Sequence, residues 1–249
     1  MGAPGPRRFE GVLVPEPEFA GDDGSIDPRL AEVLSEHADG RASVRDVASV
    51  LAGCRLMTPL LAVLDEAEMT PEGLRRDKSS HLASVSMLAP DGRRGLLAFT
   101  SVAAMAAWDP AARGIPAPAS RVAAAALQEG ADAVLLDLAG PVRVAVVGTV
   151  LRCLASGEPV PAASADPDVG AAVLACLTGV DGLAGILLEP APPGQEGSVV
   201  DLLVLVEPVP GADVALLAQQ VAEHLMADRA VVRLCPGGVA VGVAASGPD

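Results

Sequence analysis

Residues 82–99, with the sequence LASVSMLAPDGRRGLLAF, carry the clearest β-hairpin signal of the chain. Apolar and small polar residues alternate over 82–88, a Pro-Asp-Gly turn sequence follows, and residues 96–99 are apolar again. Alternation with a period of two indicates a strand with one buried face, and a short turn between two such runs is typical of a hairpin. We therefore expect two antiparallel strands here, with the rest of a sheet built around them.

Helix and strand signals continue on both sides of this hairpin. Ser101 precedes apolar residues at helical spacing that end at Trp108, and Ser120 precedes a second helical run; serine is a favoured N-cap residue. Residues 65–80 read as a long polar loop, and residues 110–119 read as a proline-rich one. The other elements expected before residue 157 are helices after Asp27 and Ser43, a strand over 56–64, strands over 133–138 and 142–147, and a helix over 149–156.

A change of composition over 158–167 indicates a domain boundary, because this stretch holds three prolines and the chain is strongly acidic after it. The expected organisation is a mobile leader (1–26), an α/β domain (27–157), a linker (158–167) and a smaller acidic α/β domain (168–249). In the last of these we expect a helix, two strands, a long helix over 212–229 and two final strands. The predicted fold class is α+β or mixed α/β, with two mixed-sheet units and helices packed on the sheets.

Charge and composition exclude several classes of partner. The 249 residues carry a net charge of −15, and an acidic chain repels phosphate backbones, so we expect no nucleic acid partner. The uncharged run 234–248 is shorter than the roughly 20 apolar residues of a membrane span, so we expect no membrane association. The four cysteines form no CxxC pair, and we expect neither a metal site nor another cofactor.

The segment 75–81, RRDKSSH, holds the single lysine of the chain beside two arginines, two serines and a histidine. Such a group can bind an anion through charge-assisted hydrogen bonds. Alternatively, it is a solvated loop in which a serine hydroxyl stabilises a turn. An active site here would require one of its hydroxyls or His81 to share a pocket with an acid. The candidate binding residues of the segment are Arg75, Arg76, Lys78, Ser79 and Ser80.

A second candidate surface surrounds the short helix expected between Ser101 and Trp108. Thr100 and Ser101 precede this helix, and Trp108, the single tryptophan, ends it. A tryptophan at this place either fills the core or packs at the helix end, or it lines a groove for a partner protein, because large aromatic side chains are frequent anchors at interfaces. We therefore add Thr100, Ser101 and Trp108 to the candidate surface.

Taken in order, three motifs resemble the SseB-type (enhanced serine sensitivity) family. They are Asp77-Lys78-Ser79-Ser80, the stretch from Phe99-Thr100-Ser101 to Trp108-Asp109-Pro110, and Val134–Leu138 followed by Ala139-Gly140-Pro141. The resemblance covers about residues 7–157, and Ala20–Gly24 and Pro59–Asp65 are similar to the version found in high-GC bacteria. It implies a cytoplasmic α/β module named after a serine-sensitivity phenotype, and it implies no catalytic residues.

We therefore expect a cytoplasmic, non-enzymatic protein-interaction or regulatory module with an unknown protein partner. The phenotype in the family name would fit a link to amino-acid metabolism, of serine or sulfur compounds. The alternatives are a small-anion or amino-acid sensor that uses the 75–81 loop, an unrecognised enzyme, and mutual binding of the two units. The last follows from charge, because residues 71–157 carry +2 and residues 158–249, with two basic and 12 acidic residues, carry −10. The oligomeric state stays open.

Overall fold

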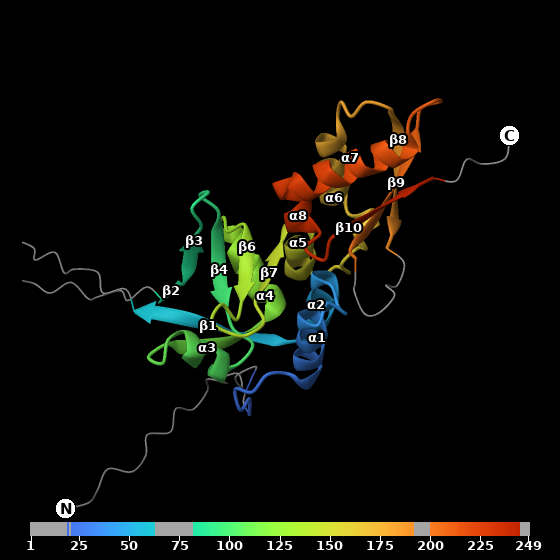
Figure 1. Ribbon diagram of the computed structural model, residues 1–249. Coiled ribbons are helices and arrows are strands. Elements are labelled where there is room, and N and C mark those ends of the chain that lie inside the picture. Colours follow the sequence, from blue (N-terminus) through green and yellow to red (C-terminus); the bar gives the residue numbers. More distant parts are fainter. Residues whose placement is uncertain (1–18, 20, 63–81, 192–199, 245–249) are drawn as a thin grey trace, which may run out of the picture.

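The computed structural model describes residue 19 and residues 21–62, 82–191 and 200–244 (Figure 1). Helices and both mixed and antiparallel sheets pack together in this part, so the predicted mixed α+β class is confirmed. The described part holds three sheets, two of them in the N-terminal half, where the prediction had one sheet in each unit. Within these residues, no helix combines the length and the apolar character needed to cross a membrane.

The chain begins its regular structure with two short helices, α1 (Pro28–Ala38) and α2 (Val44–Leu51). Asp27 accepts a hydrogen bond from the Arg29 amide at the start of α1, and Ser43 forms a reciprocal capping box with Asp46 at the start of α2. These caps satisfy amide groups that have no partner inside the helix. Both helices are amphipathic and turn their apolar side chains into the core, as the spacing predicts.

Two sheets follow in the N-terminal half. In one, β1 (Arg55–Ala62) lies between β2 (Leu82–Ser84) and β5 (Arg113–Pro118), and all pairs are antiparallel. The other has the order β3 (Ser86–Leu88), β4 (Arg94–Ala98), β6 (Ala133–Leu136) and β7 (Val144–Val147), with β4 and β6 parallel. A single bridge between Met57 and Phe99 joins the two sheets.

The predicted hairpin is confirmed in β3 and β4, but the strand expected over 82–88 is divided between the two sheets. Its first part, β2, pairs with β1, and its second part, β3, pairs with β4. Val85 lies between them, and its carbonyl accepts a hydrogen bond from the Leu97 amide. The alternation of side chains continues through this point, so the sequence pattern alone shows one strand.

Strand β5 replaces part of the expected proline-rich loop. Pro116 and Pro118 lie within it, opposite Met57 and Arg55 of β1. A proline has no amide hydrogen to donate, so it is tolerated on an edge strand, and β5 is at the edge of its sheet. The prediction of a loop was therefore wrong because the prolines were taken as breaks.

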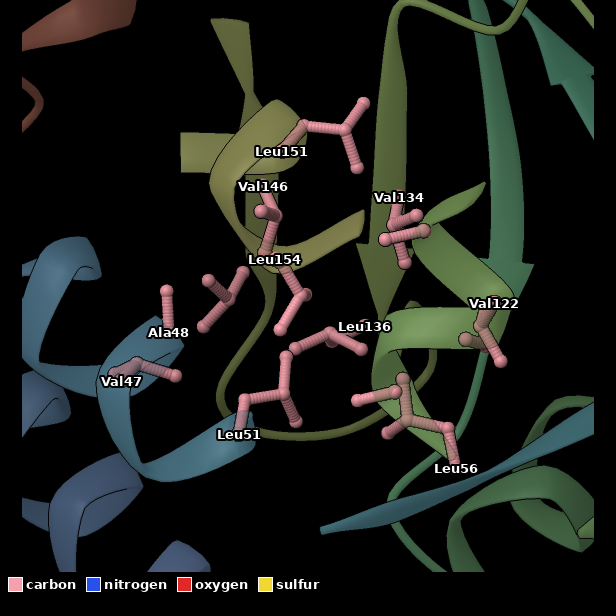
Figure 2. Packing of buried hydrophobic residues seen from close by; sticks show 14 of the residues in the cluster. Val47, Ala48, Leu51, Leu56, Val122, Val134, Leu136, Val146, Leu151 and Leu154 are labelled. Carbon is pink, nitrogen blue, oxygen red and sulfur yellow. The ribbon is translucent and has the colours of Figure 1, made fainter. Parts of the chain in front are cut away.

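The main core lies between the β4–β6–β7 sheet and the helices that cover it. These are α1, α2, α4 (Ala119–Gln128) and α5 (Gly148–Ser156), whose buried residues include Val47, Leu51, Val122 and Leu154 (Figure 2). A smaller buried cluster consists of Met57, Leu97, Phe99 and Met105. Met105 is the residue that α3 (Val102–Trp108) contributes to it. The core is aliphatic, as the composition predicts.

The C-terminal half begins with η1 (Ala163–Ala165) and α6 (Pro167–Leu177). Its sheet has the order β10 (Val239–Val243), β9 (Leu202–Pro208) and β8 (Leu183–Pro190), with β9 and β10 parallel. The long helix expected over 212–229 is observed as α7 (Val214–Ala227). Asp228 then caps a further helix, α8 (Arg229–Leu234). One described strand follows it, so the prediction of two final strands was wrong.

The predicted linker and the end of the predicted leader make specific contacts. Ala163 and Asp166, within 158–167, are buried at the junction of the two halves. Ser25 and Asp22, within 1–26, both accept hydrogen bonds from Arg55. The division into domains itself stays a prediction.

Candidate functional site

The whole of the predicted anion-binding segment, residues 75–81, lies outside the described residues. This applies to Arg75, Arg76, Lys78, Ser79 and Ser80, and also to His81. The hypothesis of a small-anion sensor or of an active site in this loop therefore stays a prediction. Thr100, Ser101 and Trp108 of the second candidate surface are described.

Thr100 and Ser101 are buried, so neither contributes a side chain to an exposed surface. The Ser101 hydroxyl accepts a hydrogen bond from the Ala104 amide at 3.0 Å and so caps α3. The Thr100 amide and hydroxyl donate to the Asp137 carboxylate at 2.9 and 2.6 Å. These two residues hold the N-terminal end of α3 in place through buried hydrogen bonds, and neither side chain is exposed to a partner.

The strand arrangement explains why Thr100 meets Asp137. Strands β4 and β6 are parallel neighbours in which Ala98 pairs with Leu136, so the residues that follow each strand emerge side by side. Asp137 has a φ of +49°, a left-handed conformation that aspartate adopts more readily than most residues. Its carbonyl accepts a hydrogen bond from the Gly140 amide at 2.7 Å. Residues 137–140, directly after β6, therefore form a tight turn that begins with the residue carrying the carboxylate.

Arg55 extends this polar cluster to the N-terminal segment. Its guanidinium pairs with Asp22 and donates to the carbonyls of Thr100 and Ser25. The hydrogen bond from Arg55 lowers the pKa of Asp22, whereas burial raises the pKa of Asp137 in spite of its bonds from Thr100. Four segments far apart in the sequence therefore meet beneath the start of α3.

Trp108 lies half-buried at the end of α3. Its ring centroid is 5.5 Å from that of Phe99, and the two rings are inclined by 32°. This contact agrees with the alternative that Trp108 packs at the helix end. The exposed residues of α3, which we call the α3 surface, are Val102, Ala103, Ala106 and Ala107.

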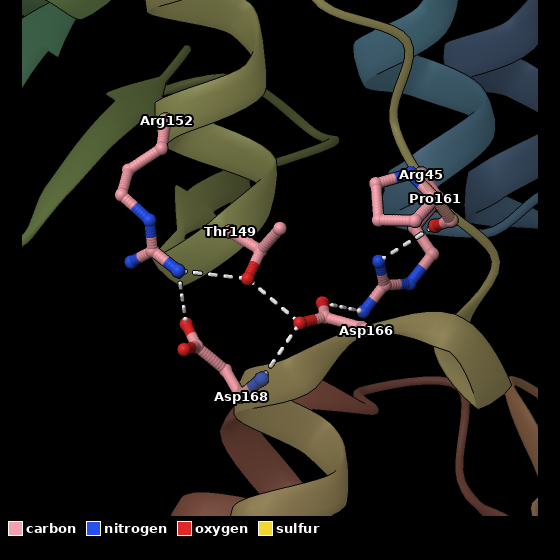
Figure 3. A network of polar contacts seen from close by, with 6 residues as sticks. All are labelled: Arg45, Thr149, Arg152, Pro161, Asp166 and Asp168. Carbon is pink, nitrogen blue, oxygen red and sulfur yellow. Dashed lines mark hydrogen bonds and ion pairs between the residues drawn. The ribbon is translucent and has the colours of Figure 1, made fainter.

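A second polar network joins the two halves of the molecule (Figure 3). Asp166 accepts hydrogen bonds at 2.7 Å from Arg45 of α2 and from Thr149 of α5, and it also accepts one from the Asp168 amide at the start of α6. Arg45 donates in addition to the Pro161 carbonyl. These bonds lower the pKa of Asp166 although its burial acts to raise it. The network is a structural connection, because Asp166 is enclosed by its partners.

A small cavity lies beside this network, between α2, β7 and α8. It measures about 20 Å³, and its lining includes Arg45, Asp201 and Arg233. A space of this size holds about one water molecule, whereas sites for small molecules are usually several hundred Å³. Within the part of the chain that the structure describes, no group of three or more potential metal-ligating side chains occurs.

The sequence patterns did not predict the contacts that Asp137 and Arg55 make. Asp137 was visible as part of a motif, but its pairing with a residue 37 positions away has no local signal. Arg55 begins a buried strand, and an arginine at such a place is a signal of an internal ion pair.

Part of the chain matches a known protein family. The family described as SseB protein N-terminal domain matches residues 30–152. This stretch includes Arg55, Thr100, α3 and Asp137. No curated protein and no solved structure matches the chain.

Proposed function

The chain belongs to the SseB family through the N-terminal domain at residues 30–152, and from this premise we propose that it is a non-enzymatic protein-interaction or regulatory module. We place its partner-binding site on the α3 surface. The proposal includes a cytoplasmic location, which the four unpaired cysteines support because reducing compartments keep thiols free.

The observation that carries this proposal is the way in which α3 is held. An ion pair and hydrogen bonds connect Asp22, Arg55, Thr100 and Asp137 next to the start of the helix. The Val102 amide also donates to the Gly24 carbonyl. The helix nevertheless exposes apolar side chains. A rigid base beneath an exposed apolar surface lowers the entropy that a protein loses on binding, so it favours recognition.

The packing of Gly24 supports a defined position for this helix. A Cβ atom on Gly24 would lie 2.6 Å from the Val102 side chain, so a glycine is needed for the N-terminal segment to approach α3 so closely. Gly24 also has a φ of +79°, which other residues rarely adopt.

The test is recovery of partners with the tagged full-length chain from a lysate of its source organism. We expect a near-stoichiometric protein that is lost with Val102→Arg. The matched control is Val209→Arg in the C-terminal half, because Val102 and Val209 expose 44% and 39% of their surface. The proposal is wrong if both variants retain the partner, or if the purified chain turns over a metabolite.

A further inference from the structure

The sheet of the C-terminal half is apolar on both of its faces. Residues 202–206 of β9 read LLVLV, so the side chains that point to either side are all apolar. A sheet with one face in water usually alternates apolar and polar residues, and continuous apolar strands are typical of sheets covered on both sides.

One face, the inner face, is covered by helices. Leu202, Val204 and Val206 are fully buried there, in a cluster to which α6, α7 and α8 all contribute. Val239 and Val241 of β10 pack against the same cluster. The register places them opposite Leu202 and Val204, which confirms that they share this face.

The other side, which we call the outer face, carries Leu187, Leu203 and Leu205. Leu187 of β8 is opposite Leu205 of β9, and Leu205 is in turn opposite Gly242 of β10. Leu187 is 47% exposed, and Leu203 and Leu205 are half-buried although they are central in the sheet. Among the described elements, the helices that build the core of this half lie on the inner face.

Glycine shapes the outer face into a ridge with a lower strip beside it. A Cβ atom on Gly242 would lie 2.9 Å from a terminal carbon of Leu205, so the leucine leans over β10 where no side chain opposes it. Ala240, opposite Leu203, continues the low strip. The three leucines therefore form a raised apolar row against which the side chains of another protein segment can pack.

The charges on the outer face are acidic. Glu189 of β8 is opposite Leu203, and Glu207 of β9 is opposite Gly185, so a carboxylate stands at each end of the leucine row. The two arginines of residues 158–249, Arg229 and Arg233, both belong to α8. A second copy of the chain on this face would bring four carboxylates together, and like charges at an interface are unfavourable.

We propose that the outer face of the β8–β9–β10 sheet docks a segment of another protein that has an apolar centre and lysine or arginine side chains at its flanks. Its apolar side chains cover Leu187, Leu203 and Leu205, and its cationic side chains pair with Glu189 and Glu207. This site shares no residue with the α3 surface. The function proposed for that surface can therefore be wrong while this proposal is correct, and the reverse.

The test uses the full-length chain and two short fluorescent peptides, one of alternating leucine and lysine and one of alternating leucine and glutamate. We expect fluorescence anisotropy to show binding of the lysine peptide, weakened about tenfold by the double substitution Leu187→Ser and Leu205→Ser because apolar contact area is lost. The double charge reversal Glu189→Lys and Glu207→Lys should exchange the preference, so that the glutamate peptide binds better.

Two substitutions on α7 are the matched controls. The exposed fraction of Leu216, 52%, is similar to that of Leu187, and Glu223 is an exposed acid like Glu207. Leu216→Ser and Glu223→Lys should therefore leave peptide binding unchanged. The single variant Leu187→Ser removes an exposed side chain and keeps the test valid where the double variant unfolds.

Three outcomes of the peptide assay overturn the proposal. They are equal binding of both peptides by the wild-type chain, no binding of either peptide, and loss of binding in the α7 controls to the same extent as in the outer-face variants. Sedimentation provides a further criterion. A concentration-dependent dimer that disappears with Leu187→Ser would assign the face to a second copy and also overturn the proposal.

Discussion

Asp137 and Asp166 are two buried carboxylates with opposite electrostatics. Asp137 is 8% exposed and Asp166 is 2% exposed, so burial alone would raise the pKa of both. In the described structure, Asp137 accepts from the uncharged amide and hydroxyl of Thr100, and its pKa is raised. Asp166 accepts from Thr149 and an amide as well, but it also pairs with the Arg45 guanidinium, and its pKa is lowered.

The comparison teaches how the set of donors decides the ionisation of a buried carboxylate. Two good hydrogen bonds satisfy Asp137 but do not outweigh the loss of hydration. At Asp166, the hydrogen bond from Thr149, together with the hydrogen bond and the charge of Arg45, outweighs the effect of burial, because an opposite charge at hydrogen-bond distance favours the ionised form. The first carboxylate holds a turn, whereas the second holds the two halves of the molecule together.

Removal of Asp166 should have the largest effect. Asp166→Ala removes the buried carboxylate that pairs with Arg45, accepts from Thr149 and caps α6, so we expect a loss of about 3 kcal/mol in the free energy of unfolding. Urea denaturation measures this. Asp168→Ala is the control, because its ion pair with Arg152 is largely exposed and should contribute at most about 1 kcal/mol. Equal losses in the two variants would contradict the structural importance of Asp166.

Removal of Asp137 should have an intermediate effect that depends on the replacement. Asp137→Ala removes the acceptor of Thr100 and places alanine at a positive φ, for a total of about 2 kcal/mol. Asp137→Asn keeps an acceptor and tolerates this conformation, so the loss should be below about 1 kcal/mol at neutral pH. Urea denaturation of the two variants side by side checks the difference. If asparagine is as harmful as alanine, the negative charge of Asp137 is needed.

The smallest expected effect is a difference in pH dependence. The raised pKa of Asp137 contributes stability that is present at low pH and is lost as pH rises through the folded-state pKa. The lowered pKa of Asp166 contributes stability that is present above the unfolded-state pKa and is lost as pH falls through the folded-state pKa. As pH rises from roughly 4 to 7, Asp137→Asn should therefore gain stability relative to the wild type. Asp166→Asn should lose stability relative to the wild type as pH rises from roughly 2 to 5.

Unfolding curves of the three proteins from roughly pH 2 to pH 7 give the measurement. We expect the two differences from the wild type to change with pH in opposite directions. Parallel changes would show that both carboxylates titrate in similar environments, contrary to the structure.

Local signals predicted much of the fold. The caps at Asp27, Ser43 and Ser101 and the apolar spacing after them located three helices, and the Pro-Asp-Gly turn located the hairpin. A cap or a turn is decided by residues within a few positions of it, and so it is readable from one sequence. The missed strand β5 shows the limit, since proline signals a break locally and only its edge position makes it acceptable.

Long-range pairs account for what could not be predicted. The bond between Arg45 and Asp166 joins residues 121 positions apart, and the bond between Arg55 and Asp22 joins residues 33 apart. Nothing in one sequence indicates which of many acids an arginine meets. The apolar character of the outer face, in contrast, is visible in the sequence of one strand, because residues 202–206, LLVLV, are apolar at every position.

The order of the strands has a consequence for synthesis on the ribosome. Strand β5 lies between β4 and β6 in the chain but pairs with β1, and the neighbours β2 and β3 belong to different sheets. The sheet β2–β1–β5 has all of its strands once Pro118 has been made, whereas the sheet with β3 and β4 awaits Val147 at the end of β7. All strands of the third sheet begin after residue 182. The strands of the three sheets therefore become available one sheet after another as the chain leaves the ribosome.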